Sequence, residues 1–445
     1  GTCTLKGEKV NMLKIERKIP EVYNADVVVC GGGPAGFIAA IAAAREGAKT
    51  ILVERIGFLG GMATAGLVGP ISNFRYNGEL IIKGIPWEFV REMEKLGGAN
   101  PANPSGNVAF DPEIYKLVAE RMIEETGVQV LLYSMITDVI VEKPGKLSHV
   151  IVENKSGKQA IACKYVIDCT GDGDILALAG FPYEISPTSE LQPVSFVFHL
   201  GGVETEALEP LYLGVGDEGG FNSELRQKLM EAQERGGDIP LFGGPWVVHG
   251  STVRPGYVSV NATRKVCSCI NNEELTKAQL DLRKDMFVLY SFIKDSIEAL
   301  KDSYIITSAA NIGTRESRRT VGLYELNIDD ILSPKEFPDA IGKGSHPIDS
   351  HSATTAAQSL TWLKGAYNVP YRSLVPQDSQ NVLVAGRNIS ATSEALASTR
   401  VQATCMALGQ AAGAAAALCA RFELPIAELD YAVLRSTLQK QDALI

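Results

Sequence analysis

Two segments in the second half of the chain carry side chains suited to anion binding and acid–base chemistry. The first, Gly313–Arg319, holds Arg315, Arg318 and Arg319, which would share one face if the segment is helical. Guanidinium groups bind carboxylates and phosphates through two parallel hydrogen bonds. We therefore predict that Arg315 and Arg318 hold an anionic group at a reaction site. The alternative is a structural ion-pair network with Glu316 and other nearby acidic residues.

The second segment, His346–His351, places a carboxylate close to an imidazole. Asp349 and His351 are two residues apart, so in an extended chain they project to the same side and can form an oriented acid–base pair. His351 is therefore the first candidate for proton transfer. The alternative is a histidine that fixes a loop and takes no part in chemistry.

A glycine-rich turn near the N-terminus has the spacing of a dinucleotide-binding site. The apolar run Val27–Cys30 leads into Gly31, Gly33 and Gly36 and then into an alanine-rich stretch, which predicts a strand, a turn and a helix. The first glycine permits the turn, the second lets a pyrophosphate approach the backbone, and the third lets helix and strand pack closely. Glu54 follows the next apolar run, where a carboxylate meets the ribose hydroxyls.

Two more apolar runs end in small residues. Tyr165–Cys169 is followed by Thr170, Gly171 and Asp172, and a run beginning at Asn381 ends at Gly386. Ligands of open α/β sheets bind at the carboxyl ends of the strands, so both turns are candidates for cofactor contact. For residues 170–172, a tight turn with solvated aspartates is the alternative. Three such turns, far apart in the sequence, exceed what a single nicotinamide domain needs.

The loop between residues 55 and 66 is too rich in glycine and too long for an ordinary connection. With this loop and the glycine turns, the chain resembles the bacterial FAD-dependent oxidoreductases of the glutathione-reductase-like fold, from Ala25 to Ala420. In that family, the segment that matches Phe58–Thr64 runs along the flavin pyrophosphate and ring. The start of the last helix, near Arg400, points at the flavin pyrimidine. The resemblance implies FAD as the cofactor.

The candidate cofactor residues come from the glycine turns, from Glu54 and the 55–66 loop, from an apolar run that contains Ile136, and from the start of the last long helix. They are Gly31, Gly33, Pro34, Ala35, Gly36, Glu54, Arg55, Gly60, Gly61, Met62, Thr64, Ile136, Thr170, Gly171, Asp172, Gly386, Arg387, Arg400, Val401 and Gln402. The resemblance adds Tyr371 as a further candidate for substrate contact. Many family members carry histidine where this chain has Ser393, so proton chemistry here would be displaced or altered. No cysteine or histidine stands in the 58–66 loop, which implies non-covalent FAD.

Charge, hydropathy and cysteine content limit the kinds of molecule and compartment that we expect for this protein. The 445 residues carry a formal net charge of −10, which argues against nucleic acid as the main partner. The longest apolar run, near residues 411–420, is shorter than a membrane span, so we expect none. The eight cysteines are scattered, and Cys267-Ser268-Cys269 has no neighbouring His or Cys cluster, so we expect no metal site. The chain begins with Gly1, which leaves open whether the protein is cytoplasmic or exported after loss of a signal segment.

We predict an α/β fold in which a Rossmann-like FAD domain is interrupted by a mixed α+β substrate domain. The FAD domain would contain a central parallel sheet and a three-stranded antiparallel meander. Gly409 and Gly413, one helical turn apart, predict close packing of the last long helix. The expected ranges are an N-terminal arm over 1–24, the FAD domain over 25–190 and 371–422, the substrate domain over 191–370, and a C-terminal helical tail over 423–445.

Together these features predict an FAD-dependent oxidoreductase that transfers a hydride between non-covalent FAD and a small, anionic or hydroxylated substrate. His351 would take or give the accompanying proton, and an arginine would hold the substrate. One alternative is an FAD-containing lyase or isomerase without net redox change. Another is a flavin-binding module without catalysis, against which the large substrate domain argues. The sequence carries no signal for the electron acceptor or the oligomeric state.

Overall fold

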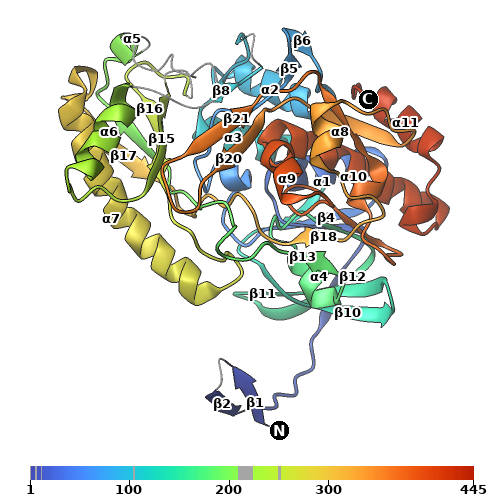
Figure 1. Cartoon of the computed structure of the whole chain (residues 1–445). Helices are drawn as coiled ribbons and strands as arrows, with labels where there is room; N and C mark the ends of the chain where they lie inside the picture. The colour runs from blue at the N-terminus through green and yellow to red at the C-terminus, as the bar shows by residue number, and fades with distance from the viewer. Residues whose placement is uncertain (1, 6–7, 12, 104–105, 209–223, 249–251) are drawn as a thin grey trace.

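The protein has two parts, each built around its own hydrophobic core. The computed structural model describes residues 2–5, 8–11, 13–103, 106–208, 224–248 and 252–445 (Figure 1). The larger core takes its buried residues from two stretches, 25–181 and 326–438. The smaller core takes them from 194–312, together with Leu67. The chain therefore leaves the larger part, builds the smaller one and returns.

A seven-stranded sheet organises the larger part, in the order β10-β11-β12-β3-β4-β9, with β23 beside β12. The pairs β12–β3, β3–β4, β4–β9 and β12–β23 are parallel. The apolar residues of the central strands, from Val27 to Cys30 on β3 and along β4 and β23, are buried, as expected where helices cover a parallel sheet. This confirms the predicted central parallel sheet. Its strands are β3 (Glu21–Cys30), β4 (Thr50–Val53), β9 (Gln129–Leu131), β12 (Gly157–Asp168) and β23 (Val382–Val384).

The predicted three-stranded antiparallel meander is confirmed. It consists of β10 (Met135–Lys143), β11 (Lys146–Asn154) and the first half of β12. Because β12 is long, its second half continues into the parallel sheet, where Asp168 pairs with Cys30 of β3. The carboxyl ends of β3 and β12 therefore lie side by side.

Two helices of the larger part touch almost backbone to backbone. They are α1 (Pro34–Arg45) and α10 (Gln402–Phe422). A Cβ added at Gly409 or Gly413 would overlap the carbonyl oxygen of Ala35 or Ala39 of α1, which confirms the predicted close packing. By length and composition α10 could cross a membrane, but 89% of the relevant window is buried inside the protein, as in the core helix of a globular fold.

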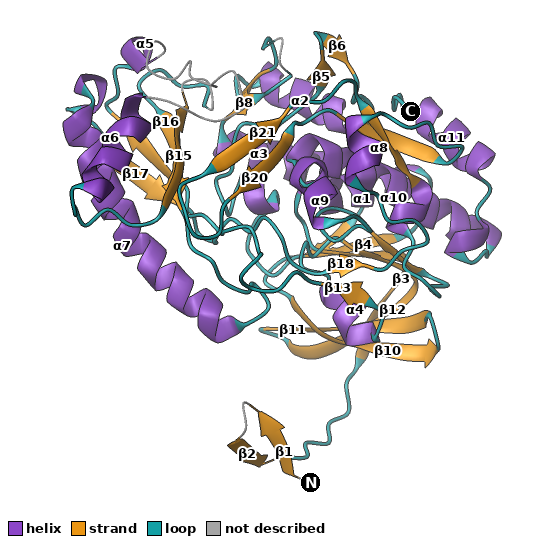
Figure 2. Cartoon of the chain, in the orientation of Figure 1, coloured by secondary structure: helices purple, strands orange, loops and turns teal. Residues whose placement is uncertain are grey.

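The other helices of the larger part pack near this pair, except α4, which lies beside β10 and β12 (Figure 2). They are α2 (Ile85–Lys95), α3 (Pro112–Glu124), α4 (Asp174–Ala179), α8 (Ile328–Leu332), α9 (Ser393–Thr399) and α11 (Tyr431–Lys440). Short strands pair locally: β5 (Arg75–Tyr76) with β6 (Glu79–Leu80), β7 (Ala99–Asn100) with β8 (Ala109–Phe110), and β13 (Tyr183–Glu184) with β18 (Arg319–Thr320).

The smaller part is an antiparallel four-stranded sheet, in the order β15-β16-β14-β17, with helices against it. On α7 the buried residues recur every three to four positions, from Ala278 to Ile293, which is the pattern of a helix with one face against a core. Its elements are α5 (Thr205–Leu208), α6 (Glu224–Glu234), α7 (Asn272–Ser296), β14 (Phe198–Gly201), β15 (Phe242–Val248), β16 (Val258–Thr263) and β17 (Tyr304–Ser308).

Two of the predicted ranges differ from the packing. The segment after residue 326 was expected in the substrate domain, but its apolar residues, including Ile341 and Tyr367, are buried in the larger core. That segment contains the paired strands β19 (Ala340–Gly344) and β22 (Tyr367–Pro370).

At the N-terminal end, β3 already begins at Glu21, inside the expected arm. The strands β1 (Thr2–Leu5) and β2 (Glu8–Asn11) form a hairpin apart from the body (Figure 1). Residues 1, 6–7 and 12 of the arm lie outside the described residues.

Candidate functional site

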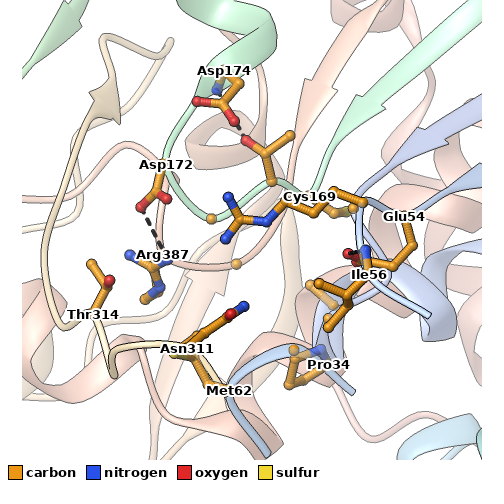
Figure 3. Close-up of a pocket in the computed structure, with 18 of the residues that line it drawn as sticks. Pro34, Glu54, Ile56, Met62, Cys169, Asp172, Asp174, Asn311, Thr314 and Arg387 are labelled. Atoms are coloured by element: carbon orange, nitrogen blue, oxygen red, sulfur yellow. Dashed lines mark hydrogen bonds and ion pairs between the residues drawn. The ribbon is translucent and has the colours of Figure 1, made fainter. Parts of the chain in front are cut away.

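A cavity of about 460 Å³ lies where the carboxyl ends of the parallel strands meet the smaller part. This volume falls in the range typical of small-molecule sites. The larger part contributes its strand ends and the start of α1. The smaller part contributes residues near the start of α7, among them Cys269, and the segment that contains Asn311 and Thr314 (Figure 3). Both parts are therefore needed to build the cavity.

The first glycine turn has the geometry that the sequence predicted. Gly31 has a φ of +100°, and a Cβ added to it would overlap the carbonyl oxygen of Cys169. A Cβ at Gly36 would overlap the carbonyl oxygen of Gly31, so helix and strand are in contact there. At Gly33 the nearest atom to an added Cβ is Cα of Gly61, 3.8 Å away. The protein therefore leaves the surface above Gly33 free for a ligand.

The start of α1 opens into the same cavity. Gly33 is the N-cap and Pro34 the first helical residue, and both line the cavity. Within the described chain, no side chain caps this helix and no acidic residue lies in its first turn. Unpaired N–H groups and the positive end of the helix dipole therefore face the cavity, as a pyrophosphate site requires.

Glu54 is held rigidly at the end of β4. Its carboxylate is buried and accepts hydrogen bonds from the backbone N–H of Gly32 at 2.7 Å and of Ile56 at 3.0 Å. A carboxylate has about four lone-pair positions, so acceptor capacity remains for two hydroxyl groups. Because Glu54 also lines the cavity, it is well placed to bind a ribose.

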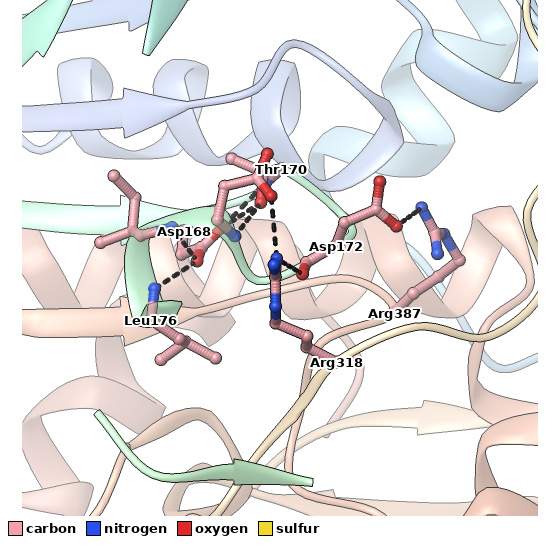
Figure 4. A network of polar contacts seen from close by, with 8 residues as sticks. Asp168, Thr170, Asp172, Leu176, Arg318 and Arg387 are labelled. Atoms are coloured by element: carbon pink, nitrogen blue, oxygen red, sulfur yellow. Dashed lines mark hydrogen bonds and ion pairs between the residues drawn. The ribbon is translucent and has the colours of Figure 1, made fainter. Parts of the chain in front are cut away.

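A buried aspartate that the sequence analysis missed shapes the second glycine turn (Figure 4). Asp168 accepts two hydrogen bonds from Thr170, at 3.0 Å from its N–H and 2.7 Å from its hydroxyl. Its other oxygen accepts from the N–H groups of Ile175 and Leu176 at the start of α4. Burial raises the pKa of Asp168 to about 6, although these bonds favour the carboxylate. The sequence signal was an acidic residue inside a buried strand.

Arg318 supports this turn and does not line the cavity. Its Nη1 donates to the carbonyl oxygen of Asp172 at 3.0 Å and to Oδ1 of Asp174 at 3.1 Å. The described segment 309–318 forms no helix, so the three arginines point in different directions and do not share a face. Arg319 instead pairs with Glu316 at 2.6 Å. These bonds place the guanidinium of Arg318 against the turn, outside the cavity lining, so its predicted catalytic role stays a prediction.

Arg315, Asp349 and His351 do come together. Nη1 of Arg315 donates to the carbonyl oxygen of Pro193 at 2.5 Å and to the hydroxyl of Ser195 at 3.2 Å. His351 lies on the hairpin of β20 (Ile348–His351) and β21 (Gln358–Thr361). Its Nε2 is 3.1 Å from Oδ2 of Asp349, which confirms the predicted pair.

Burial sets the charge state of this pair. It lowers the pKa of His351 to about 3, with the positive charge of Arg315 acting in the same direction. Burial alone would raise the pKa of Asp349, but the hydrogen bond with His351 and the positive charge of Arg400 hold it well below its usual value. The imidazole is therefore neutral and the carboxylate ionised near neutral pH. The side chain of His351 is only 4% exposed and is not part of the cavity lining, so its predicted role in proton transfer stays a prediction.

Tyr371 lies in the larger core, away from the cavity lining. It is 1% exposed, and its hydroxyl donates to the carbonyl oxygen of Ile426 at 2.9 Å. Its ring packs edge-on against Tyr431. This placement contradicts the predicted substrate contact, because the hydroxyl already binds backbone inside the core.

Most of the predicted cofactor residues line the cavity. Four of them do not line it. Gly36 lies where helix packs on strand, and Val401 is the N-cap of α10. Thr64 donates to the carbonyl oxygen of Leu59 at 2.7 Å, and Gly60, in the same loop, has a φ of +110°. Those in the lining are Gly31, Gly33, Pro34, Ala35, Glu54, Arg55, Gly61, Met62, Ile136, Thr170, Gly171, Asp172, Gly386, Arg387, Arg400 and Gln402.

Several cavity residues had no sequence signal. Cys269, Leu275 and Gln279 come from the smaller part, where no glycine turn marks them. Thr314 lies inside the arginine-rich segment Gly313–Arg319 and Asn311 lies two residues before it, which is the one hint that the sequence offered.

Polar atoms around the cavity fit a polar cofactor. Within the described part of the chain, Nη1 of Arg387, Nη1 of Arg400 and Oε1 of Gln402 are buried without a hydrogen-bond partner, and all three residues line the cavity. Buried polar groups are normally paired, so these atoms indicate partners that a bound molecule would supply. With the open surface above Gly33 and the fixed carboxylate of Glu54, the residues fit a dinucleotide.

Comparison with known proteins agrees with this geometry. The family described as FAD dependent oxidoreductase matches residues 26–438 of the chain. Thiamine thiazole synthase of Methanococcus vannielii is 28% identical over 160 residues, which cover 34% of this chain and 58% of that protein. Digeranylgeranylglycerophospholipid reductase of Methanocaldococcus jannaschii is 31% identical over 194 residues, which cover 40% of this chain and 46% of that protein. The chain thus matches about half the length of these relatives.

Among solved structures, a geranylgeranyl bacteriochlorophyll reductase-like protein of Thermoplasma acidophilum aligns over 95% of this chain and 84% of its own. Its TM-score is 0.47, at 15% sequence identity. The family match, in contrast, extends over both parts of the protein and every glycine turn of the cavity. The chain therefore belongs to the FAD dependent oxidoreductase family.

Proposed function

We propose that the cavity binds FAD in one defined direction. The ribose of the adenosine half would bind Glu54, and the pyrophosphate would bind the backbone at Gly33 and the start of α1. The flavin half would lie toward Arg400 and Gln402. The observation that carries this proposal is that one cavity is lined by Glu54, by Gln402 and by all three glycine turns. We further propose that the FAD domain is of the glutathione-reductase-like type.

FAD, when bound, supplies the ring that accepts or donates a hydride. We propose that the chain around it holds a small substrate between the two parts, with Asn311 of the smaller part and Thr314 just after it forming one wall. The part over residues 194–312 would then act as the substrate domain. Enclosure by both parts excludes water from the reacting groups, which strengthens the electrostatic interactions that orient the substrate.

For His351 we propose a positioning role. It holds the carboxylate of Asp349, which in turn contacts Arg400 on the cavity wall. A proton carrier must lie within hydrogen-bond reach of the substrate, directly or through one water molecule. The enclosed position of His351 behind Arg400 does not offer this, so we propose that it acts through its neighbours.

The test is anaerobic reduction of the purified, FAD-loaded protein. Hydroxy acids, sugars and polyols are added one at a time, and the visible absorbance of the flavin is followed. We expect at least one class to bleach the flavin, and an added electron acceptor to restore its colour. A protein that takes up no FAD would contradict the proposal, and so would product formation with the flavin oxidised throughout.

A further inference from the structure

Three arginines from different segments meet beside the FAD cavity. This arginine cluster consists of Arg264 after β16, Arg315 and Arg400. Arg264 is 2% exposed, the side chain of Arg400 is 8% exposed, and Arg315 is partly buried. Their charges act on each other: burial lowers the pKa of Arg315, and the nearby charges of Arg264 and Arg400 lower it further. Of the three, Arg400 alone is part of the cavity lining, so the cluster reaches the cavity through Arg400, with Arg264 and Arg315 behind it.

The cluster has hydrogen-bond donors to spare. Arg264 donates through Nη1 to Oδ1 of Asn261 at 2.7 Å and to the carbonyl oxygen of Thr263 at 2.8 Å. Its Nε and Nη2, however, are buried without a partner in the described part of the chain. Arg400 donates through Nη2 to the carbonyl oxygen of Asp349 at 3.0 Å, while among the described residues its Nη1 has no acceptor. Such unpaired buried donors are costly.

The cluster also carries excess positive charge. Guanidinium groups stay protonated in proteins, so the three arginines bring three positive charges. Asp349 contributes one negative charge, 3.5 Å from Arg400, and its neighbour His351 is neutral near neutral pH. Glu316 acts on Arg400 as well, but it is already paired with Arg319. Buried charge without compensation is strongly unfavourable, so the cluster has room for a further anion.

We propose that the arginine cluster binds a carboxylate group of the substrate, with Arg264 as a main contact. This inference rests on the proposed function and adds the substrate class to it. Nε and Nη2 lie on one edge of the guanidinium, and that edge matches the two oxygens of a carboxylate. An anion bound there would balance the excess charge and satisfy the unpaired donors of Arg264 and Arg400 together. Sequence reasoning missed Arg264, since it stands alone at the end of a strand.

Gly243 gives a second way to test the position of Arg264. A Cβ added at Gly243 would overlap Nε of Arg264 and come within 2.7 Å of its Cζ. The substitution Gly243→Ala would therefore push the guanidinium aside while keeping its charge. Arg264→Gln removes the charge, and Arg264→Lys keeps it without the two-point edge. Arg45→Gln is the matched control, because Arg45 pairs with Glu88 at the surface and is not part of the cavity lining.

The experiment uses the FAD-loaded protein with acetate and succinate as probes, acetamide and succinamide as neutral controls, and inorganic phosphate as a separate arm. Binding is read from the flavin difference spectrum and from the melting temperature. We expect a saturable response to the carboxylates that their amides do not give at equal concentration. Arg264→Gln, Arg264→Lys and Gly243→Ala should weaken carboxylate binding at least about tenfold while flavin absorbance is retained, and Arg45→Gln should match the wild type.

Several results would each overturn the inference. They are equal responses to acetate and acetamide, wild-type affinity in the folded Arg264 and Gly243 variants, and a response to phosphate without one to carboxylates. If Arg264→Gln does not fold, Arg264→Lys and Gly243→Ala decide. A protein that binds FAD and is reduced by neutral alcohols, but gives no carboxylate response, would refute the carboxylate site and leave the proposed function standing.

Discussion

At the scale of single residues, Asp168 supports the second glycine turn of the cavity without lining the cavity itself. Its carboxylate accepts hydrogen bonds from Thr170, Ile175 and Leu176, and in each of them it is the acceptor. In Asp168→Asn, one oxygen becomes an NH₂ group that faces N–H donors. We expect the free energy of unfolding to fall by about 1–3 kcal/mol, since buried donors lose their acceptor. Urea unfolding measures this loss, and Asp378→Asn, at an exposed position, is the control.

His199 supplies a prediction for pH. It is buried, with its Nδ1 2.9 Å from the hydroxyl of Tyr257, and burial lowers its pKa from 6.5 to about 4. Between these values the unfolded chain binds the proton more readily than the folded chain does. Stability contributed by the neutral His199 is therefore present above pH 6.5 and is lost as the pH falls toward 4.

The measurement is the free energy of unfolding across this range for the wild type and for His199→Asn. The raised pKa of Asp168 acts in the opposite direction at the acidic end, so the comparison between the two proteins is the informative quantity. We expect the acid-induced loss to be smaller in His199→Asn. Equal pH dependence in both proteins would show that His199 does not titrate as described.

At the scale of elements, the contact between α1 and α10 couples helix packing to the cofactor. Gly409 lies against Ala35, which lines the cavity, and Gly413 lies against Ala39, one turn further along α1. Both Gly409→Ala and Gly413→Ala should lower the free energy of unfolding, by about 1–3 kcal/mol, because the added methyl group overlaps backbone. Only Gly409→Ala should also weaken FAD binding. FAD titrations that find both variants equally affected would contradict this coupling.

The elements also show what a sequence can predict. Gly31, Gly33, Gly36 and Glu54 were found because their roles follow from a short local pattern of strand, turn and helix. The arginines of Gly313–Arg319 would share a face if the segment were helical, but among the described residues this segment forms no helix. Its side chains instead contact distant strands and turns. Periodicity cannot decide between these outcomes when tertiary contacts fix the backbone.

The residues that were missed share one property. Asp168, Arg264 and Cys269 acquire their places only when separate parts of the chain come together around the cavity. Tyr371 was misplaced for the same reason, because its motif says nothing about which way its hydroxyl points. Local chemistry is thus readable from the sequence, whereas the choice between lining the cavity and supporting it is not.

At the scale of the whole molecule, two hydrophobic cores share one cavity. A ligand that binds only the folded protein stabilises it by mass action, and at a free concentration about 100 times its Kd this amounts to about 2.7 kcal/mol. FAD should therefore raise the melting temperature of both parts together. Calorimetry in which FAD stabilises the larger core but leaves the transition of the smaller core unchanged would contradict a cavity built by both.

The most direct test of the account is the FAD affinity of Gly33→Ala. An added Cβ at Gly33 meets nothing closer than 3.8 Å, so the apoprotein should melt like the wild type while the methyl group occupies the place of the pyrophosphate. Gly342→Ala, whose Cβ would lie 3.4 Å from Ala407, is the matched control. We predict at least about tenfold weaker FAD binding by Gly33→Ala alone. Wild-type affinity in Gly33→Ala would contradict the placement of FAD in this cavity.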